Sequence, residues 1–133
     1  MPITAAGAKI LGPYLATMSS VQTLNLWNNG FGVEGATALG PHLAAMPNLR
    51  TLFLAENSLG AEGAAALGPH LEAMRSVHTL YLQDNNIGSE GAKAVGAHLE
   101  AMPALRTLFL QENDIEAADV AAVGPRLAAI ARL

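Results

Sequence analysis

The stretch from 49 to 74, LRTLFLAENSLGAEGAAALGPHLEAM, decides the fold, because nearly the same letters recur on both sides of it at a step of 28 residues. The step is followed most strictly by one leucine and one asparagine of each unit: Leu24, Leu52, Leu80 and Leu108, and Asn29, Asn57, Asn85 and Asn113. Self-similarity at a fixed period of this size is the sequence signature of a stacked repeat array.

Each unit changes its hydrophobic period in the middle. In the segment 51–55, TLFLA, Leu52 and Leu54 fall on one face, as in a half-buried strand. The apolar residues that follow are spaced three, four and three apart, which is one face of a helix: Ala64, Leu67, Leu71 and Met74. Stacked strand and helix units predict an α/β solenoid with a parallel sheet on a concave face and helices on a convex face, because strands sit closer together than helices do.

The chain divides into repeats of one domain that spans 1–133. We expect a half repeat that contains only a helix, three full repeats and a C-terminal repeat or cap: 1–20, 21–48, 49–76, 77–104 and 105–133. This division predicts four strands and five helices. The strand near Thr107 is then an open sheet edge, which the final helix over 117–133 covers only in part.

The unit resembles the leucine-rich repeats of the ribonuclease-inhibitor subtype. The resemblance covers essentially the whole chain and is carried by Leu49, Leu52, Leu54, Asn57, Leu59, Gly60, Gly63 and Leu67 with their counterparts one period away. It implies a short horseshoe arc whose strand face binds proteins, since members of this family act as inhibitors, GTPase activators or sensor domains. The last unit departs from the pattern, because Glu116, Ala118 and Asp119 replace Gly60, Glu62 and Gly63, so we expect its turn into the helix to differ.

Two features of each repeat are predicted to be structural. The asparagine ladder formed by Asn29, Asn57, Asn85 and Asn113 falls where the chain leaves each strand, and a buried amide there must be satisfied by backbone groups of its own and adjacent turns. The Gly-Pro pairs at 40–41, 68–69 and 124–125 lie inside helical segments, where proline predicts a kink or a restarted helix.

Outward residues of successive strands form columns that could carry function. Threonines at 23, 51, 79 and 107 suit cross-strand support. The next column holds three aromatic residues on adjacent strands, and Trp27 stands one column over: Phe53, Tyr81 and Phe109. An exposed aromatic stripe is typical of a recognition surface, although the rings could instead only stack and shield the sheet.

Charged residues flank this stripe at both ends of the strands. Acidic residues follow the strands at Glu56, Asp84 and Glu112, and basic residues precede them at Arg50 and Arg106. Two rails of opposite sign could orient a partner, or they could be a solvated rim that keeps the molecule in solution.

Composition excludes several other classes of function. The formal net charge is −4 without any run of like charge, which argues against a nucleic-acid partner. The absence of cysteine and of a signal-like leader favours an intracellular location, and no apolar stretch approaches the length of a membrane span. A histidine column at 42, 70 and 98 has helix spacing, too wide for one metal ion, so we expect surface histidines and predict no metal or cofactor.

No catalytic motif is present, so the sequence predicts a binding protein and not an enzyme. The leading hypothesis is a protein- or peptide-binding scaffold whose anchors are Trp27, Phe53, Tyr81 and Phe109, oriented by the charged rails. The alternatives are a structural module that self-associates as a homo-oligomer, and a fragment or engineered consensus of a larger repeat protein. Near-identity of the repeats favours these, since TLFLAEN at 51–57 and TLFLQEN at 107–113 differ at one position.

Overall fold

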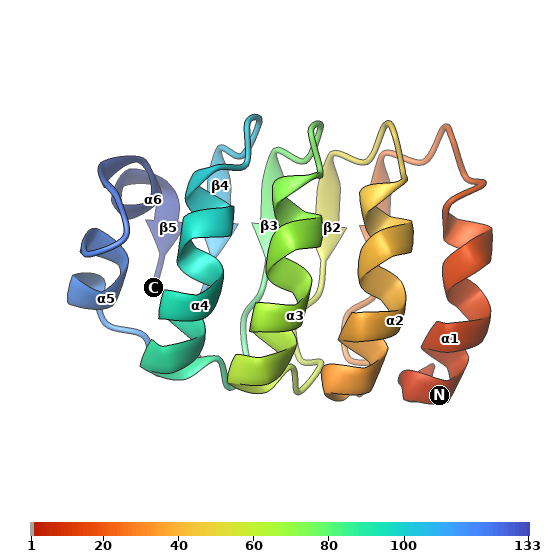
Figure 1. Cartoon of the computed structure of the whole chain (residues 1–133), viewed down its shortest axis with the longest axis horizontal. Coiled ribbons are helices and arrows are strands. Elements are labelled where there is room, and N and C mark those ends of the chain that lie inside the picture. Colours follow the sequence, from red (N-terminus) through yellow and green to blue (C-terminus); the bar gives the residue numbers. More distant parts are fainter. Residues whose placement is uncertain (1) are drawn as a thin grey trace.

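A computed structural model describes residues 2–133, which form six helices and five strands that alternate along the chain until α5 and α6, which are consecutive (Figure 1). The helices are α1 Thr4–Leu15, α2 Gly32–Ala44, α3 Gly60–Glu72, α4 Gly88–Glu100, α5 Ala117–Ala121 and α6 Pro125–Ile130. The strands are β1 Thr23–Asn25, β2 Thr51–Phe53, β3 Thr79–Tyr81, β4 Thr107–Phe109 and β5 Ala131–Arg132.

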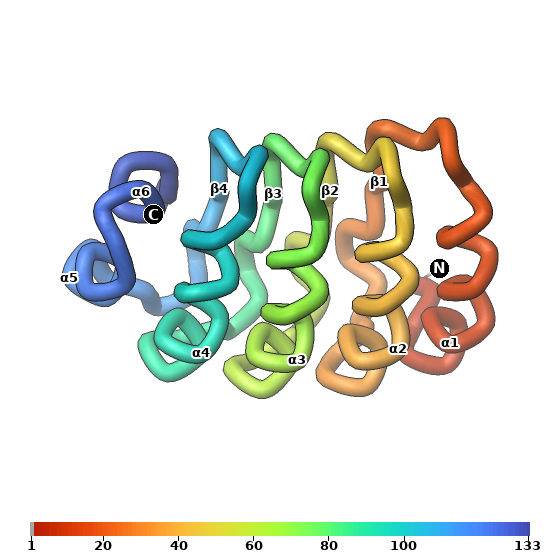
Figure 2. Tube along the Cα trace, turned by 45° about the horizontal axis from the view of Figure 1, so that its top comes forward, coloured from red at the N-terminus to blue at the C-terminus, as the bar shows by residue number. Residues whose placement is uncertain are grey.

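The strands form one parallel sheet in the order β1-β2-β3-β4-β5, and the helices cover one of its faces (Figures 1 and 2). Pairing from β1 to β4 keeps the 28-residue step, so that Leu24 is level with Leu52 and Leu52 with Leu80. This confirms the predicted α/β solenoid. The other face of the sheet carries no helix, and we call it the open sheet face.

The core is a continuous stack of the repeat's apolar positions between the sheet and the helices. Leu52, Leu80 and Leu108 are fully buried from the strand side. Helix residues of the three-four-three pattern meet them from the other side, and Leu67 and Leu71 are 1% exposed. Each unit thus buries its leucines against its neighbours, which is why no unit is stable alone.

The C-terminal end differs from the prediction in two ways. The expected helix over 117–133 is two short helices, α5 and α6, and the chain then returns to the sheet as β5. This fifth strand pairs with β4 through Leu108 and Phe109, so the edge that we expected to be open near Thr107 is covered. β5 begins 23 residues after its partner Leu108 and not 28, because α5 and α6 together are shorter than a full repeat helix and its connections.

The turn into α5 also differs, as the sequence predicted. In the full repeats a glycine with positive φ opens the helix, as Gly60 does at +66°. In the last unit Glu116 and Asp119 form a reciprocal capping box, in which the Asp119 carboxylate accepts the Glu116 backbone N–H at 3.0 Å. A carboxylate cap needs no left-handed glycine, which explains the loss of the Gly-rich turn.

The Gly-Pro pairs behave in two ways. At Pro125 the helix restarts, because Gly124 is extended and Pro125 takes the first position of α6, where its missing N–H is no loss. At Pro41 and Pro69, where a kink or a restart was predicted, the helix does not restart, since α2 and α3 run through the proline for one further turn. A proline so close to the helix end removes a single hydrogen bond, and packing against the neighbouring helices outweighs that loss.

The asparagine ladder connects every repeat to the next. Asn57 is fully buried, and its Nδ2 donates to the carbonyls of Leu26 at 2.8 Å and Leu54 at 3.0 Å. Its Oδ1 accepts the backbone N–H of Asn29 at 2.8 Å, while the Asn57 N–H donates to Asn85 Oδ1 at 2.9 Å. Every amide therefore binds its own turn and the one before it.

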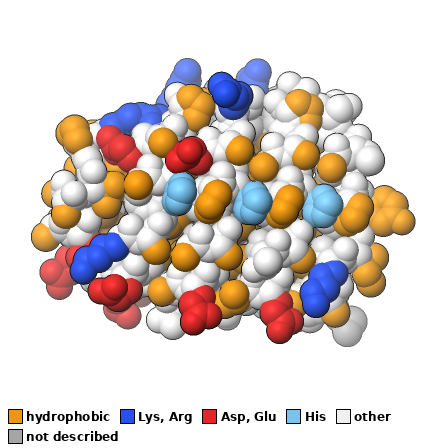
Figure 3. Space-filling view, in the orientation of Figure 1, with side chains coloured by type: hydrophobic (Ala, Val, Ile, Leu, Met, Phe, Trp, Pro, Cys, Tyr) orange, Lys and Arg blue, Asp and Glu red, His pale blue; other side chains and the backbone are white. Residues whose placement is uncertain are grey.

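The histidines of α2, α3 and α4 lie in a row across the helix face (Figure 3). They are surface residues, as predicted, but each is half-buried because its ring packs against a glycine of the preceding helix. An ideal Cβ on Gly68 would lie only 2.5 Å from His98 Cδ2, and Gly12 and Gly40 face the next histidine in the same way. Gly12, Gly40 and Gly68 are thus notches for the neighbouring imidazoles, whereas Gly124 of the last Gly-Pro pair faces the Glu100 carboxylate.

Replacing Asn57 by Ala should lower the free energy of unfolding by about 3 kcal/mol, because it leaves the Asn29 N–H buried without a partner and removes one of the two amide donors from each of the carbonyls of Leu26 and Leu54. Urea unfolding followed by circular dichroism measures the change. Asn29→Ala is the matched comparison: Asn29 is 9% exposed, and its Nδ2 donates only within its own turn. A loss at Asn57 no larger than that at Asn29 would contradict the ladder's role.

Replacing Gly68 by Ala should lower stability by about 1–3 kcal/mol through overpacking against His98. The direction of the change in stability is informative, because alanine in a helix interior otherwise stabilises a protein by about 1 kcal/mol relative to glycine. Thermal unfolding of G68A, H98A and the double variant gives the coupling between the two positions, and the double variant should recover part of the loss. A G68A protein that is more stable than the wild type would disprove the notch.

Candidate partner-binding groove on the open sheet face

The aromatic stripe is a continuous stack on the open sheet face. Strand alternation turns Phe53, Tyr81 and Phe109 away from the core, and the parallel register places them side by side. The ring centroids of Phe53 and Tyr81 are 4.2 Å apart at 11°, and those of Tyr81 and Phe109 are 4.5 Å apart at 9°. All three side chains are half-buried, so they both support one another and present ring edges to solvent.

A groove of about 410 Å³ lies beside this stack at the exit ends of the strands. Trp27, Phe53 and Tyr81 supply its aromatic walls. Its rim is acidic and comes from the turns that follow β2, β3 and β4: Glu56, Asp84 and Glu112. The structure thus brings together six of the predicted partner-binding residues in one hollow.

Trp27 is the most accessible of these aromatics, with 52% of its surface exposed. It follows β1, the edge strand, whose outer side has no neighbouring strand among residues 2–133. Asn25 Oδ1 accepts the Trp27 backbone N–H at 3.0 Å, which satisfies a donor that a further strand would otherwise take. This local turn holds Trp27 at the end of the groove, next to the buried Ala55.

The acidic rim follows from the backbone of the turns. Glu56, Asp84 and Glu112 each precede a ladder asparagine and have positive φ angles of 57°, 54° and 60°. The left-handed conformation costs a residue other than glycine about 1 kcal/mol or more. The buried ladder enforces it, and the three carboxylates project into solvent on the groove side.

The remaining predicted residues lie outside the groove. Phe109 is at the far end of the stack, where the guanidinium of Arg132 lies 5.9 Å from its ring centroid. Arg50 and Arg106 are exposed at the opposite ends of the strands, up to about 20 Å from the acidic rim. Sequence reasoning missed Arg132, because it reaches Phe109 through the shortened step of β5 and no 28-residue column contains it.

Two glutamines complete the groove beneath its acidic rim. Gln83 and Gln111 continue the column of Trp27 and Ala55, and both line the groove. Their Oε1 atoms are buried and have no hydrogen-bond partner within residues 2–133. A buried acceptor without a donor is uncommon in proteins, so each amide would gain a hydrogen bond from a donor that meets it once the side chain turns into the groove.

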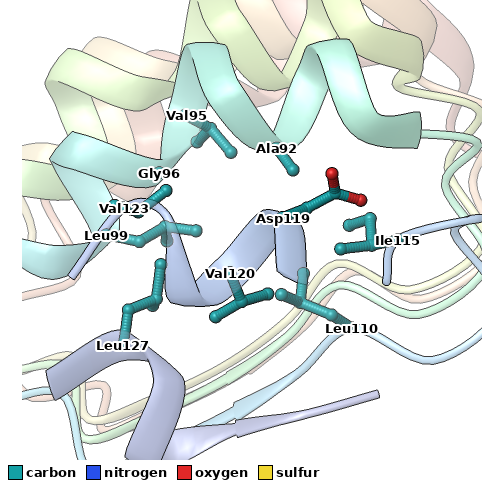
Figure 4. A pocket seen from close by; sticks show the side chains of 10 residues that line it. All are labelled: Ala92, Val95, Gly96, Leu99, Leu110, Ile115, Asp119, Val120, Val123 and Leu127. Atoms are coloured by element: carbon teal, nitrogen blue, oxygen red, sulfur yellow. The ribbon is translucent and has the colours of Figure 1, made fainter. Parts of the chain in front are cut away.

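A second hollow, between α4 and the C-terminal cap, has no room for a ligand (Figure 4). It is apolar, with Val95, Val120 and Leu127 among its walls, and its volume of about 10 Å³ holds one water at most. It is therefore a packing defect under the cap. Among residues 2–133 no group of histidine and carboxylate side chains is placed to hold a metal ion.

Asp119 lies at the rim of this hollow, and its pKa differs from the ordinary value of 3.8. Its pKa is lowered, chiefly because the carboxylate accepts the Glu116 backbone N–H, and further because Ser89 Oγ donates to it at 2.9 Å and Lys93 lies nearby. Asp119 serves the cap and is not part of the groove.

The repeat has a family match in sequence. A model described as "Leucine Rich repeat" matches residues 17–40, 45–68 and 73–96, which is more than half of the chain. The chain therefore belongs to the leucine-rich repeat family. No curated protein shows significant similarity to it in sequence.

Solved structures with the same fold include two domains of similar size. One is described as "Leiomodin-1 Actin-Binding Site 2 (ABS2)", with a TM-score of 0.72 at 16% identity over 87% of this chain and 69% of that one. The other is the tropomodulin C-terminal domain of Caenorhabditis elegans, with a TM-score of 0.68 at 13% identity over 90% of this chain and 74% of that one. At these identities the likeness shows the fold. None of the helices within residues 2–133 is long and apolar enough to cross a membrane.

Proposed function

We propose that this chain is a protein- or peptide-binding module and that the groove on the open sheet face is its binding site. The observation that carries the proposal is the exposure of Trp27 beside the stacked Phe53 and Tyr81 in one groove. Tryptophan and tyrosine are the residue types that dominate binding energy at protein interfaces.

The size of the groove supports a short peptide as the bound segment. Its volume of about 410 Å³ is within the range of about 300–1,000 Å³ of ligand sites. The strands are only three residues long, so the flat part of the open sheet face is far smaller than the roughly 800 Å² that each partner gives to a standard interface. A partner protein would therefore insert a loop or terminus and not dock a broad surface.

The chemistry of the groove supports binding and not catalysis. Its side chains are aromatic rings, amides, carboxylates and one alanine, and none of them is a serine, cysteine or lysine nucleophile beside a histidine. The leiomodin domain of similar fold is named for a site that binds actin, a protein. That likeness supports a protein partner for this chain and identifies none.

Two further assignments belong to the proposal. The full α-helix of 13 residues in each complete repeat favours the ribonuclease-inhibitor-like subtype of the family. The chain has no cysteine, and we assign it to an intracellular, reducing compartment, in which disulfides are rare.

Replacing Phe53 and Tyr81 together by Ala should weaken peptide binding at least about tenfold, because both aromatic walls next to Trp27 are lost. Nine-residue peptides selected on the intact chain from a displayed random library supply the ligands, and fluorescence anisotropy measures their affinity. Ile10→Ala with Tyr14→Ala is the matched control, since these side chains are 72% and 64% exposed on α1 and lie outside the groove.

Circular dichroism establishes that each variant is folded. If the double variant is unstable, Trp27→Ala alone replaces it, because a side chain so exposed contributes little to the core. Undiminished affinity in a folded groove variant would disprove the assignment of the site.

A second candidate function, self-association, is favoured by the N-terminal flank. The outer side of β1 is unpaired within the described part of the chain, and α1 exposes Ile10 and Tyr14 next to it. Another copy could cover both surfaces. The C-terminal edge offers less for such a contact, because the strand there is β5, which has only two residues.

Light scattering over a hundredfold range of concentration tests the second candidate. Self-association through the flank predicts a mass that rises with concentration in the wild type and stays monomeric in the I10A/Y14A variant. A wild-type protein that is monomeric throughout contradicts it and leaves the groove as the binding surface.

A further inference from the structure

The groove carries a strong excess of negative charge and of hydrogen-bond acceptors. Glu56, Asp84 and Glu112 form its rim, and no lysine or arginine is among its lining residues. The ion pairs among residues 2–133, Lys93 with Glu90 and His98 with Glu72, involve none of these three carboxylates. The rim therefore has no internal partner for its charge.

The unsatisfied acceptors lie below that rim. The buried Oε1 atoms of Gln83 and Gln111 need donors, and the carboxylates above them accept hydrogen bonds only. A ligand that satisfies both must present several N–H groups on one positively charged head. An acidic or apolar segment would leave these acceptors unpaired, which costs binding energy.

The aromatic walls favour a planar cation over a compact one. A guanidinium stacks on aromatic faces and offers five donors in a fixed fork that matches carboxylates, whereas the lysine ammonium is a strongly hydrated point charge. The stack already holds such a group at its other end, where Arg132 lies over Phe109 at 5.9 Å. The Arg132 guanidinium thus shows that a ring of the aromatic stripe can pack against a planar cation.

We propose that the groove binds an arginine side chain of an extended peptide, with the guanidinium stacked on the exposed Trp27 beside the ring edges of Phe53 and Tyr81. It is hydrogen-bonded to the acidic rim and, once the Gln83 side chain turns into the groove, to Gln83 Oε1. This inference rests on the proposed function and adds the chemical class of the partner. The partner is a basic peptide segment, selected by charge complementarity. Arg50 and Arg106 at the opposite strand ends set its direction, because they repel a second basic residue there.

The test uses peptides selected on the intact chain from a random nine-residue library. Selection should enrich arginine at one position, and replacing that arginine by citrulline, which has nearly the same shape without the charge, should weaken binding at least about tenfold. Trp27 is the only tryptophan, so its emission reports occupancy of the groove directly. Raising the salt concentration should weaken the arginine peptide more than the citrulline peptide.

The protein provides a matched pair of charge variants. E56Q, D84N and E112Q together remove the rim charge and should reduce affinity for the arginine peptide by about tenfold or more. The control combines E34Q, E62Q and E90Q, which make the same change of net charge on the helix face. Acidic side chains gather there along the edge at which the helices begin (Figure 3). This control variant should bind the arginine peptide with unchanged affinity.

The outcomes separate this inference from the function on which it rests. Selected peptides that depend on Phe53 and Tyr81 but lack a basic residue, or that bind the rim variant as tightly as the wild type, overturn the arginine proposal and leave the binding function standing. Failure to select any peptide overturns both. A change of Trp27 emission with protein concentration alone, without peptide, would assign the groove to a second copy of the chain and would also overturn the proposal.

Discussion

The buried amide of the asparagine ladder is the interaction on which the rest of the structure depends. Each turn after a strand buries backbone carbonyls that no sheet or helix can satisfy, and one Nδ2 group per repeat binds them in its own turn and in the one before. The left-handed backbone of Glu56 and Asp84, directly before the ladder residues, belongs to the same turn. The acidic rim of the groove is therefore positioned by the ladder, and the scaffold and the candidate site share one cause.

Close helix packing is the second constraint, and it is met by glycine and histidine together. Strands are about 4.8 Å apart while helices need about 8–10 Å, so a stack of such units must bend. Glycines at the contact points let neighbouring helices approach, and the imidazoles of His42, His70 and His98 fill the notches. The helix spacing of the stack is therefore set by these glycine and histidine contacts as well as by the core leucines.

Periodicity predicted the parts of the molecule that repeat and missed the parts that do not. The strand register, the core leucines and the aromatic column all follow from the 28-residue step, because equal spacing forces equal positions in a parallel sheet. β5 and the place of Arg132 could not be predicted, since the last connection is shorter than a repeat. The columns of aromatic and acidic residues that line the groove were likewise predictable. The position of Trp27 at the end of the groove was not, because it depends on the hydrogen bond between the Trp27 N–H and Asn25 Oδ1 at the edge strand.

The distribution of sequence variation within the chain argues that one column of the open sheet face, the column that lines the groove, is free of the constraint that keeps the core uniform. Core columns are nearly constant from repeat to repeat, as Leu52, Leu80 and Leu108 show, whereas the column of the groove reads Trp27, Ala55, Gln83 and Gln111. A column needed only for stacking would be as uniform as the core. The only large ring in this column is that of Trp27 at the N-terminal end, and Arg132 covers the aromatic stripe at its C-terminal end. The accessible part of the stripe thus spans about three strands, which matches a short bound segment better than the face of a folded partner.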